Sequence, residues 1–301
     1  MTLSVISLSF LMLCFGNSSS IPSPQEIDKE KINKVLKEVY ELDQKYRYTV
    51  DSLSRSKADM AILATALLPM IEQDEKNREV VFPIIDSIIH YQINDLDSLS
   101  YKACFLVMQH SHQEIAQLPQ DKQDKYYGFV LSLAQDDYIS SLNYAWYVDR
   151  MNVYNNKAQK YGVQVELKRN RVKVLYPINE QYNKSWEDLG LEFNEEKEWK
   201  DVDYPPILIS DDEFAILGFI FKKQEPDLNN SNEYEYRGVE GVQVKVNESN
   251  YTFTDGFGYF YFVVDKASIP ERIQIITDKD KFEYEIESKD DTDFIIINYV
   301  L

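Results

Sequence analysis

The chain has 301 residues, of which 44% are hydrophobic and 13% aromatic, so it can form one large or two ordinary domains with real cores. Its formal net charge is −19, and from Asp201 onward 22 acidic residues stand against 9 basic ones. This charge repels phosphate backbones and anionic lipid, so we expect neither nucleic-acid binding nor charge-driven membrane binding.

The N-terminus has the order of a secretory signal peptide. The apolar run Leu3–Phe15 precedes Gly16 and a small polar tract, residues 17–20, although no Lys or Arg precedes the run. We expect residues 1–20 to be a cleaved signal and the protein to be periplasmic or extracellular. The run is shorter than the ~20 residues of a transmembrane helix, and no later stretch approaches that length.

The two cysteines, Cys14 and Cys104, give one alternative and one exclusion. Cys14 could carry the lipid of a bacterial lipoprotein, although Leu13 before it fits that signal poorly. If the signal is removed, Cys104 is left alone and no intramolecular disulfide is possible.

A first helix is expected from Gln25, with Ser23 as N-cap and Pro24 at its first position. Asp43 and Arg47 are four residues apart on this helix, and Gln44 lies beside them. Either the two charges form a surface ion pair worth ~0.3–0.5 kcal/mol, or they form a buried pair that belongs to a site. The expected apolar face consists of Ile32, Val35, Leu36, Val39 and Leu42.

The next helical segment, residues 56–71, is nearly continuous in Ala, Leu, Ile and Met, so we expect it at the centre of a bundle. Residues 74–77 are predicted to be a polar break. Another apolar helix is expected at residues 80–89, followed by a linker at residues 93–100.

Two of the three histidines lie in a helix predicted over residues 101–118. His110 shares its side with Ala103, Leu106 and Val107, and it is either a hydrogen-bonded core histidine or a catalyst. His110 and His112 face different ways on a helix, so they cannot ligate one metal together. We predict no metal site and no cofactor.

The segment of residues 149–164, DRMNVYNNKAQKYGVQ, carries the most informative polar residues. Asp149 falls in a helical stripe with Ile139, Leu142, Trp146 and Val153, where an apolar residue is the default. A carboxylate on an inward face needs a partner. The other candidate site residues here are Arg150, Gln159, Tyr161 and Gln164.

Residues 163–167 and 172–175 flank the basic tip of residues 168–171, a pattern that predicts a β-hairpin. The tip could meet an anionic partner or be a solvated turn.

Residues 38–193 resemble the uncharacterised bacterial domain-of-unknown-function family 6624. The motifs that carry the resemblance are Asp43-Gln44 with Arg47, Gln109-His110, Asp149-Arg150, and the run from Gln159 to Gln164 followed by Tyr176-Pro177-Ile178. Val163 replaces a frequent Thr, and a Gly-Trp-Pro usual near residues 87–92 is absent. The resemblance implies that the polar residues above belong together, but it assigns no activity.

The segment 201–206, closed by Pro205-Pro206, is the expected domain boundary, which gives a helical domain of residues 21–200. Beyond it the periodicity becomes that of strands, and we predict a β-sandwich over residues 207–301. The fold class is therefore α+β in two domains, a mainly helical one with a small β-hairpin and an all-β sandwich. The expected strands are residues 215–221, 242–246, two aromatic strands around a turn at 254–258, and 272–276, 281–286 and 294–300.

Residues 214–301 resemble the carboxypeptidase regulatory-like domain, a transthyretin-like β-sandwich. The resemblance rests on Gly218, on the run from Gly238 to Val244, and on Thr254-Asp255 with Gly258 and Phe260; the Asn-rich insertion before Gly238 departs from the usual spacing. It implies an accessory or adhesive module without a catalytic set. The acidic groups 211–213 and 290–293 lack the ligand spacing of a calcium loop, so solvated acidic loops are favoured over calcium.

These observations predict a secreted or periplasmic protein of the bacterial cell envelope that binds an unknown envelope component or protein. No nucleophile motif, metal-ligand spacing or phosphate-binding glycine loop stands in the sequence. The alternative is a hydrolase or lyase of a small polar substrate, with His110 as general base, Asp149 as its orienting partner, and Arg47, Gln159 and Gln164 holding the substrate. The same residues could equally form a structural network.

Overall fold

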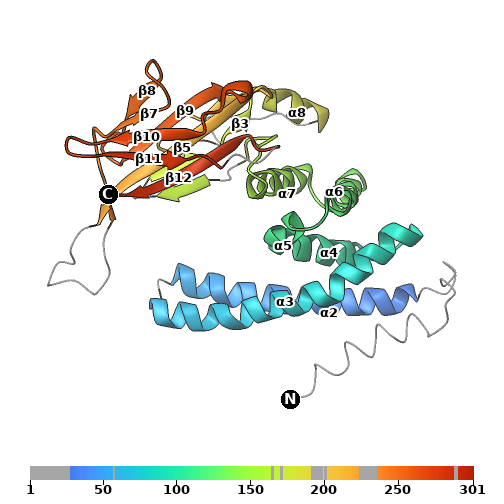
Figure 1. The fold of residues 1–301 in the computed structure, drawn as a ribbon. Helices are drawn as coiled ribbons and strands as arrows, with labels where there is room; N and C mark the ends of the chain where they lie inside the picture. The colour runs from blue at the N-terminus through green and yellow to red at the C-terminus, as the bar shows by residue number, and fades with distance from the viewer. Residues whose placement is uncertain are drawn as a thin grey trace. The chain divides into compact units, whose positions relative to one another are not determined.

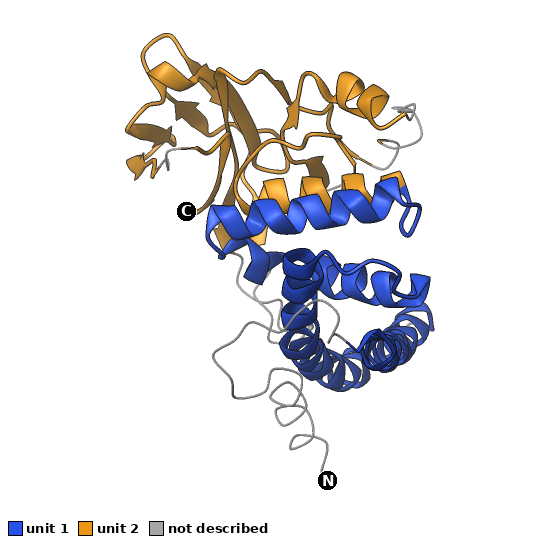
Figure 2. Ribbon diagram, turned by 90° about the vertical axis from the view of Figure 1, so that its right-hand side faces the viewer, with its two compact units in different colours: residues 1–140 blue, residues 141–301 orange. Residues whose placement is uncertain are grey.

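The computed structural model describes residues 28–56, 58–163, 166–169, 172–190, 199, 202–223, 236–287 and 291–301. The predicted signal peptide with Cys14, the cap at Ser23-Pro24, Gln164, and part of the basic hairpin tip lie outside the described residues. The chain forms an α+β fold with two compact units, residues 1–140 and 141–301, coloured separately in Figure 2.

The first unit is helical. Its elements are α2 (Lys29–Arg55), α3 (Met60–Tyr91), α4 (Ser98–His110), α5 (His112–Ala116) and α6 (Gln120–Gln135). The helix α2 is capped by Asp28, whose side chain accepts a hydrogen bond from the amide of Lys31. The long helices α2 and α3 form an antiparallel hairpin, and α4 packs against both (Figure 1).

Three expectations about these helices are wrong. The predicted break at residues 74–77 does not exist, because α3 is continuous and the side chains of Asp74 and Asn77 find polar partners beside it. The single helix predicted over residues 101–118 divides at Ser111, whose hydroxyl donates to the carbonyl of Val107. The apolar segment 60–71 is not central, since Met60 and Leu68 are 77% and 63% exposed.

The second unit begins with α7 (Ser141–Tyr154) and the antiparallel hairpin of β1 (Glu166–Arg169) and β2 (Val172–Leu175), which confirms the predicted hairpin. Then follow β3 (Ile178–Asn179), α8 (Tyr182–Asp188) and β4 (Leu208–Ile209). The strands of the sandwich are β5 (Glu213–Lys223), β6 (Tyr236–Gly238), β7 (Gln243–Lys245), β8 (Tyr251–Phe253), β9 (Tyr259–Asp265), β10 (Arg272–Ile276), β11 (Lys281–Glu285) and β12 (Phe294–Val300), with a short 3-10 turn, η2 (Lys266–Ser268), after β9.

The strand β5 organises this unit (Figure 1). It pairs in parallel with β12 and antiparallel with β9 and β6, while β11, β10, β7 and β8 form the second sheet in that order. The eight residues 214–221 are all buried, as expected of a strand that is covered on both faces. At Gly218 an added Cβ would lie 2.4 Å from the carbonyl oxygen of Ile297, so glycine is required where β12 approaches.

The two faces of β5 have different neighbours. Phe214 and Ile216 belong to the core between the two sheets, whereas Leu217 and Phe219 belong to a second core. That second core also contains Ala158, Val172, Val174, Ile207 and Ile209. The boundary expected at residues 201–206 therefore differs from the structure: α7 and the hairpin belong with the sandwich because they cover the outer face of its central sheet.

Candidate functional site

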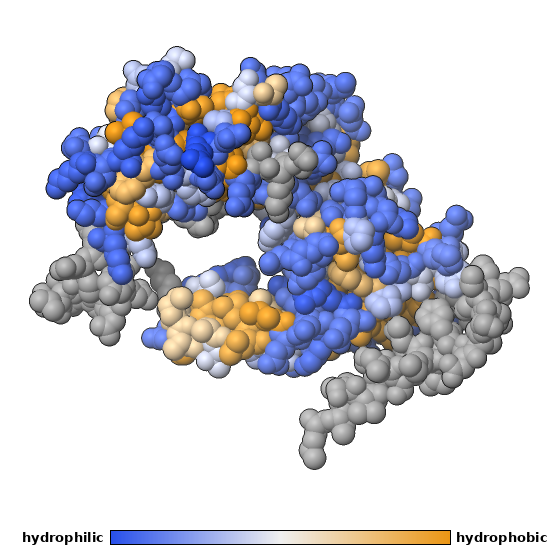
Figure 3. All heavy atoms as spheres, viewed as in Figure 1, coloured by the Kyte–Doolittle hydropathy of each residue, from blue (hydrophilic) through white to orange (hydrophobic). Residues whose placement is uncertain are grey.

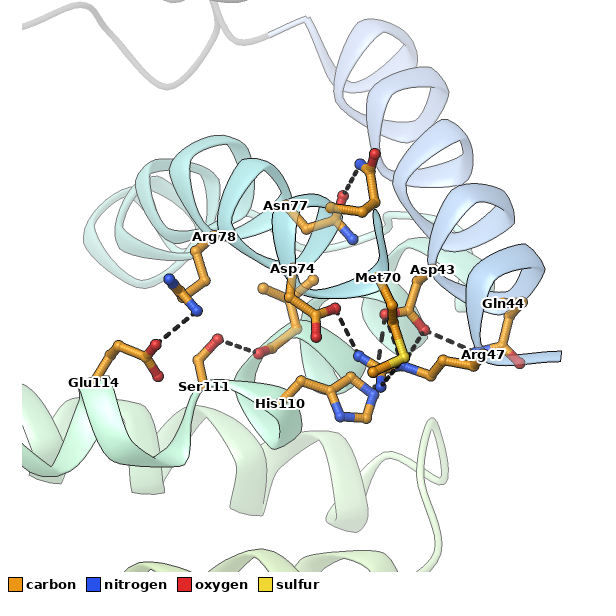
Figure 4. Close-up of polar contacts among 12 residues, drawn as sticks. Asp43, Gln44, Arg47, Met70, Asp74, Asn77, Arg78, His110, Ser111 and Glu114 are labelled. Carbon is orange, nitrogen blue, oxygen red and sulfur yellow. Dashed lines mark hydrogen bonds and ion pairs between the residues drawn. The ribbon is translucent and has the colours of Figure 1, made fainter. Parts of the chain in front are cut away.

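In the first unit, polar residues continue the stripes of buried residues on two helices, α2 and α3. On α2, Asp43 follows the buried Leu36 and Val39, and on α3, Asp74 and Asn77 precede the buried Val81. These residues face one another where α2, α3 and α4 meet (Figure 4). We call Asp43, Arg47, Asp74 and His110 the polar cluster.

Asp43 and Arg47 form a buried pair rather than a surface pair. The Asp43 side chain is 2% exposed, and both of its oxygens accept hydrogen bonds from Arg47 Nε, at 3.1 and 3.2 Å. Gln44 Nε2 donates to the same carboxylate at 3.0 Å. Arg47 thus neutralises the negative charge that the interior would otherwise disfavour.

Arg47 also connects α2 to α3. Its Nη2 donates to Asp74 Oδ1 at 2.6 Å, and its Nη1 lies 3.6 Å from the sulfur of Met70 (Figure 4). Burial raises the pKa of Asp74 above its ordinary value, and Arg47 acts in the opposite direction. One guanidinium therefore stands between two carboxylates, and the cluster carries a negative charge when His110 is neutral.

His110 ends α4 and points into this cluster (Figure 4). Its Nε2 lies 4.0 Å from Asp43 Oδ1, which is an ion-pair distance only when the imidazole is protonated. The carboxylate facing His110 is thus Asp43. In chemical terms the cluster can accept a proton at His110 and hold opposite charges between helices.

Asp149 belongs to the second unit and has other partners. It is completely buried, and its two oxygens accept hydrogen bonds from the amides of Lys160, Tyr161 and Val163 at 2.7–2.9 Å. Burial raises the pKa of Asp149 to about 7, and the amides oppose this shift because they favour the charged form. Asp149 was expected to orient His110. Its hydrogen bonds instead go to the amides of residues 160–163, so the carboxylate fixes a loop of its own unit.

Two other residues predicted in this segment, Gln159 and Tyr161, help to hold the same loop, whereas Arg150 does not. Gln159 Nε2 donates to the carbonyl of Tyr176, and Trp186 Nε1 donates to the carbonyl of Tyr161 at 2.7 Å. Gly162, with φ of +69°, turns the chain where Ile178 leaves little room for a side chain. Arg150 lies over the ring of Trp146, at 5.9 Å from its centroid.

Metal-ligand sets are absent from the described residues: no group of three or more His, Cys, Asp and Glu side chains could hold an ion there. Of the acidic groups weighed for calcium, Asp293 binds Lys266 and the amide of Ala158, and Asp211 accepts from Asn179. Asp290 lies outside the described residues. Cys104 is buried, and burial raises the pKa of its thiol to about 12, so it is unreactive at neutral pH.

The second unit has an open sheet face that the sequence analysis did not single out. Val244 and Ile275 point into the core between the sheets, so the alternate residues of β7, β8 and β10 point outward. Tyr251 and Phe253 stand on this outer face, 51% and 56% exposed. Alternation along residues 251–253, together with the pairing to β7, is the signal that would have found them.

The register of the sheet places polar side chains beside these rings. Gln243 pairs with Phe253, Lys245 pairs with Tyr251, and Gln274 follows Lys245 across the sheet. We call these five residues the outer sheet face. A separate surface pocket in this unit is lined by Glu213, Val246, Asn247, Asn250, Val263, Val264, Asp265 and Ser268, and it includes none of the predicted site residues.

No family model, no curated protein and no solved structure matches the chain. The resemblances to family 6624 and to the carboxypeptidase regulatory-like domain therefore stay predictions. Among the described residues, no helix combines the length and the apolar character that crossing a membrane requires.

Proposed function

We propose that this protein is a secreted or periplasmic binding protein of the bacterial cell envelope, and that the outer sheet face takes a carbohydrate of that envelope. The exposed aromatic pair Tyr251 and Phe253 carries the proposal. Aromatic rings that stay in solvent on a sheet are costly to hydrate, and such surfaces mark sites of interaction. The leader-like residues 1–20 support a location outside the cytoplasm.

The neighbours of the rings favour a sugar over a purely apolar ligand. A sugar ring has an apolar face that can lie on an aromatic ring, and hydroxyl groups that need hydrogen-bond partners. The side chain of Gln243 supplies an amide donor and acceptor beside Phe253, and Gln274 supplies another one strand farther along the same face, next to Lys245. The Lys245 ammonium lies 2.6 Å from Glu248, so one charged pair borders the same face.

The alternative, a hydrolase built on His110 and Asp149, has weaker support. Asp149 would have to release three backbone amides, two of them buried, before it could orient a histidine, and each orphaned buried amide costs roughly 1–3 kcal/mol. Arg47 would have to leave two carboxylates to hold a substrate. These costs favour a structural role for both sets of residues.

Calorimetric titration with soluble peptidoglycan fragments and neutral oligosaccharides tests the proposal. We expect binding by the parent and about fivefold weaker binding by Tyr251→Ala, because one stacking contact is worth roughly 1 kcal/mol. Phe257→Ala is the control, since Phe257 is 46% exposed but lies outside strands β7, β8 and β10. Equal affinities of parent and Tyr251→Ala, or no binding of any glycan, would contradict the proposal.

A further inference from the structure

The strand β12 lies at the end of its sheet and pairs in parallel with β5 (Figure 1). At the two ends of this ladder, the carbonyl of Asp293 accepts a hydrogen bond from β5 and the amide of Leu301 donates one to β5. Backbone groups of successive residues in a strand point to opposite sides, so the odd-numbered residues between these two also face β5. The amides and carbonyls of Ile296, Asn298 and Val300 therefore point away from β5.

This outward side of β12 is open beyond its first residue. The amide of Phe294, which also points away from β5, donates to the carbonyl of Asn156 at 3.3 Å. Within the part of the chain that the structure describes, β5 is the only strand that pairs with β12. Asn298 is exposed, and Val300 is 49% exposed. Ile296, Asn298 and Val300 thus present three amides and three carbonyls in a row, and we call them the open edge of β12.

The open edge lacks the features that usually protect an exposed strand. Residues 294–301 contain no charged residue, no proline and no glycine, whereas folded proteins commonly place such residues on an edge or keep the edge strand short. The edge strand β11 of the other sheet carries Lys281, Glu283 and Glu285, and β6 and β8 have only three residues each. Figure 3 shows hydrophobic residues at the surface near the C-terminal end of this unit, among hydrophilic ones. An edge of this kind can receive a further strand.

We propose that the open edge of β12 binds an extended, lysine- or arginine-rich segment of a partner protein, which adds to the sheet as one more strand. The geometry of the edge decides for a polypeptide. Its donors and acceptors alternate at the spacing of a β-strand, and an extended backbone carries the complementary groups at the same spacing. The main-chain hydrogen bonds give the affinity, and the side chains of the added strand give the selectivity.

The acidic surroundings decide that the segment is basic. The sixteen residues that precede β12 contain eight acidic and three basic side chains. The strand β11 lies beside β12, since the rings of Phe282 and Tyr299 are 5.6 Å apart between centroids. On β11, Arg272 pairs with both Glu283 and Glu285, so one positive charge stands against two negative ones. Lysine or arginine side chains of a partner are attracted here, whereas a second copy of this chain brings the same excess of acid and is repelled.

This inference goes beyond carbohydrate binding and does not depend on it. The strand β12 contributes no residue to the outer sheet face, which consists of residues of β7, β8 and β10. A protein that binds no glycan can therefore still bind a peptide strand at β12, and the two proposals fail separately.

Fluorescence anisotropy with three labelled octapeptides and the purified full-length protein tests the proposal. The first peptide alternates lysine and valine, the second lysine and proline, and the third glutamate and valine. We expect the lysine–valine peptide to bind at least about tenfold more tightly than the lysine–proline peptide, which has the same charge but lacks half of the amide hydrogens. The glutamate–valine peptide can pair equally well but is repelled, so it should also bind at least about tenfold more weakly.

Variants of the edge itself locate the binding. Asn298→Pro removes an amide that points away from β5, so it leaves the ladder to β5 complete, and we expect it to weaken binding of the lysine–valine peptide about tenfold. Asn298→Ala is the matched control, because it keeps the amide and should bind like the parent. Val300→Pro repeats the test at the last residue of β12, and it decides the matter if thermal unfolding shows that Asn298→Pro does not fold.

Equal binding of the lysine–valine and lysine–proline peptides would overturn the proposal, because it would show attraction by charge alone. No binding of the lysine–valine peptide up to about 1 mM would overturn it as well. The same holds if folded proline variants bind the peptide as tightly as the parent. Self-association of the protein that the proline variants abolish would overturn it in favour of a second copy.

Discussion

Each of the two units buries a carboxylate, and they compensate it in different ways. Asp43 lies between helices and is neutralised by the side chain of Arg47, whereas Asp149 faces a loop and accepts bonds from three backbone amides. The amides inside a helix are already bonded to carbonyls, so a carboxylate between helices must find a side-chain donor. A loop has unbonded amides to offer. The contrast shows that local backbone structure decides how a buried charge is stabilised.

We expect the largest loss of stability when Asp149, which holds the loop of residues 160–163 in the second unit, is replaced. Asp149→Ala removes the acceptor of three backbone amides, two of them buried, so we expect the free energy of unfolding to fall by about 3–5 kcal/mol. Urea denaturation of the parent and the variant measures this loss. Asp278→Ala, a change of an exposed aspartate in the same unit, should stay within about 0.5 kcal/mol of the parent. A loss below about 1 kcal/mol would show that water replaces the carboxylate.

The charge pair of the first unit should be the next most sensitive. Arg47→Met leaves Asp43 buried without its guanidinium, and we expect a loss of about 3 kcal/mol in the free energy of unfolding. The same helix offers a matched control in Arg55→Met, because Arg55 and Asp51 have the same spacing but are 83% and 65% exposed. That variant should lose under about 0.5 kcal/mol. Equal losses from the two variants would remove the distinction between a buried and a surface pair.

Two glutamines should show the same contrast between a buried and an exposed position, with smaller losses of stability. Gln159 is completely buried and donates to the carbonyl of Tyr176, so Gln159→Ala should cost about 1–2 kcal/mol. Gln44 donates to Asp43 from an exposed position, where water can replace it, so Gln44→Ala should cost under about 0.5 kcal/mol. Thermal unfolding of both variants measures the difference. The reverse order would mean that Gln44 is essential to the Asp43 pair.

Stability should also depend on pH through Asp149. Its pKa of about 7 in the folded state lies above the ordinary value of 3.8, so the folded protein binds the proton more tightly than the unfolded chain. The stabilisation is complete below about pH 4 and is lost as the pH rises through 7, with a decrease of about 1 kcal/mol between pH 6 and 7. Carbon NMR of the Asp149 carboxyl group should show a titration midpoint near 7. A midpoint below 4 would mean that the three amides outweigh burial.

Local sequence patterns predicted much of this molecule. The alternation and aromatic content of the C-terminal third predicted its strands, and β10 and β12 have the predicted bounds, because side chains on a strand alternate between core and solvent. Helical spacing likewise predicted that Asp149 lies on an inward face, and Asp149 is buried. For Asp43 the spacing left a surface pair and a buried pair open, and the structure shows the buried one. The strands and the burial of Asp149 depend on residues within a few turns of one another, so they can be deduced without the fold.

Contacts between distant segments decided the rest. Asp74 was predicted to lie in a polar break between helices. Its partner, Arg47, is 27 residues away in the sequence, and only the packing of α2 against α3 brings the two together. The boundary between the units depends on Val172 and Val174 covering β5, which no local composition records. Residues 60–71 look like the centre of a bundle by composition, yet Met60, Leu68 and Ile71 are each more than half exposed, so part of this apolar segment lies at the surface. The sequence alone determined most of the strands and the burial of Asp149, because these depend on local alternation and helical spacing. Only the tertiary structure decided which apolar faces are covered and what the buried polar residues contact.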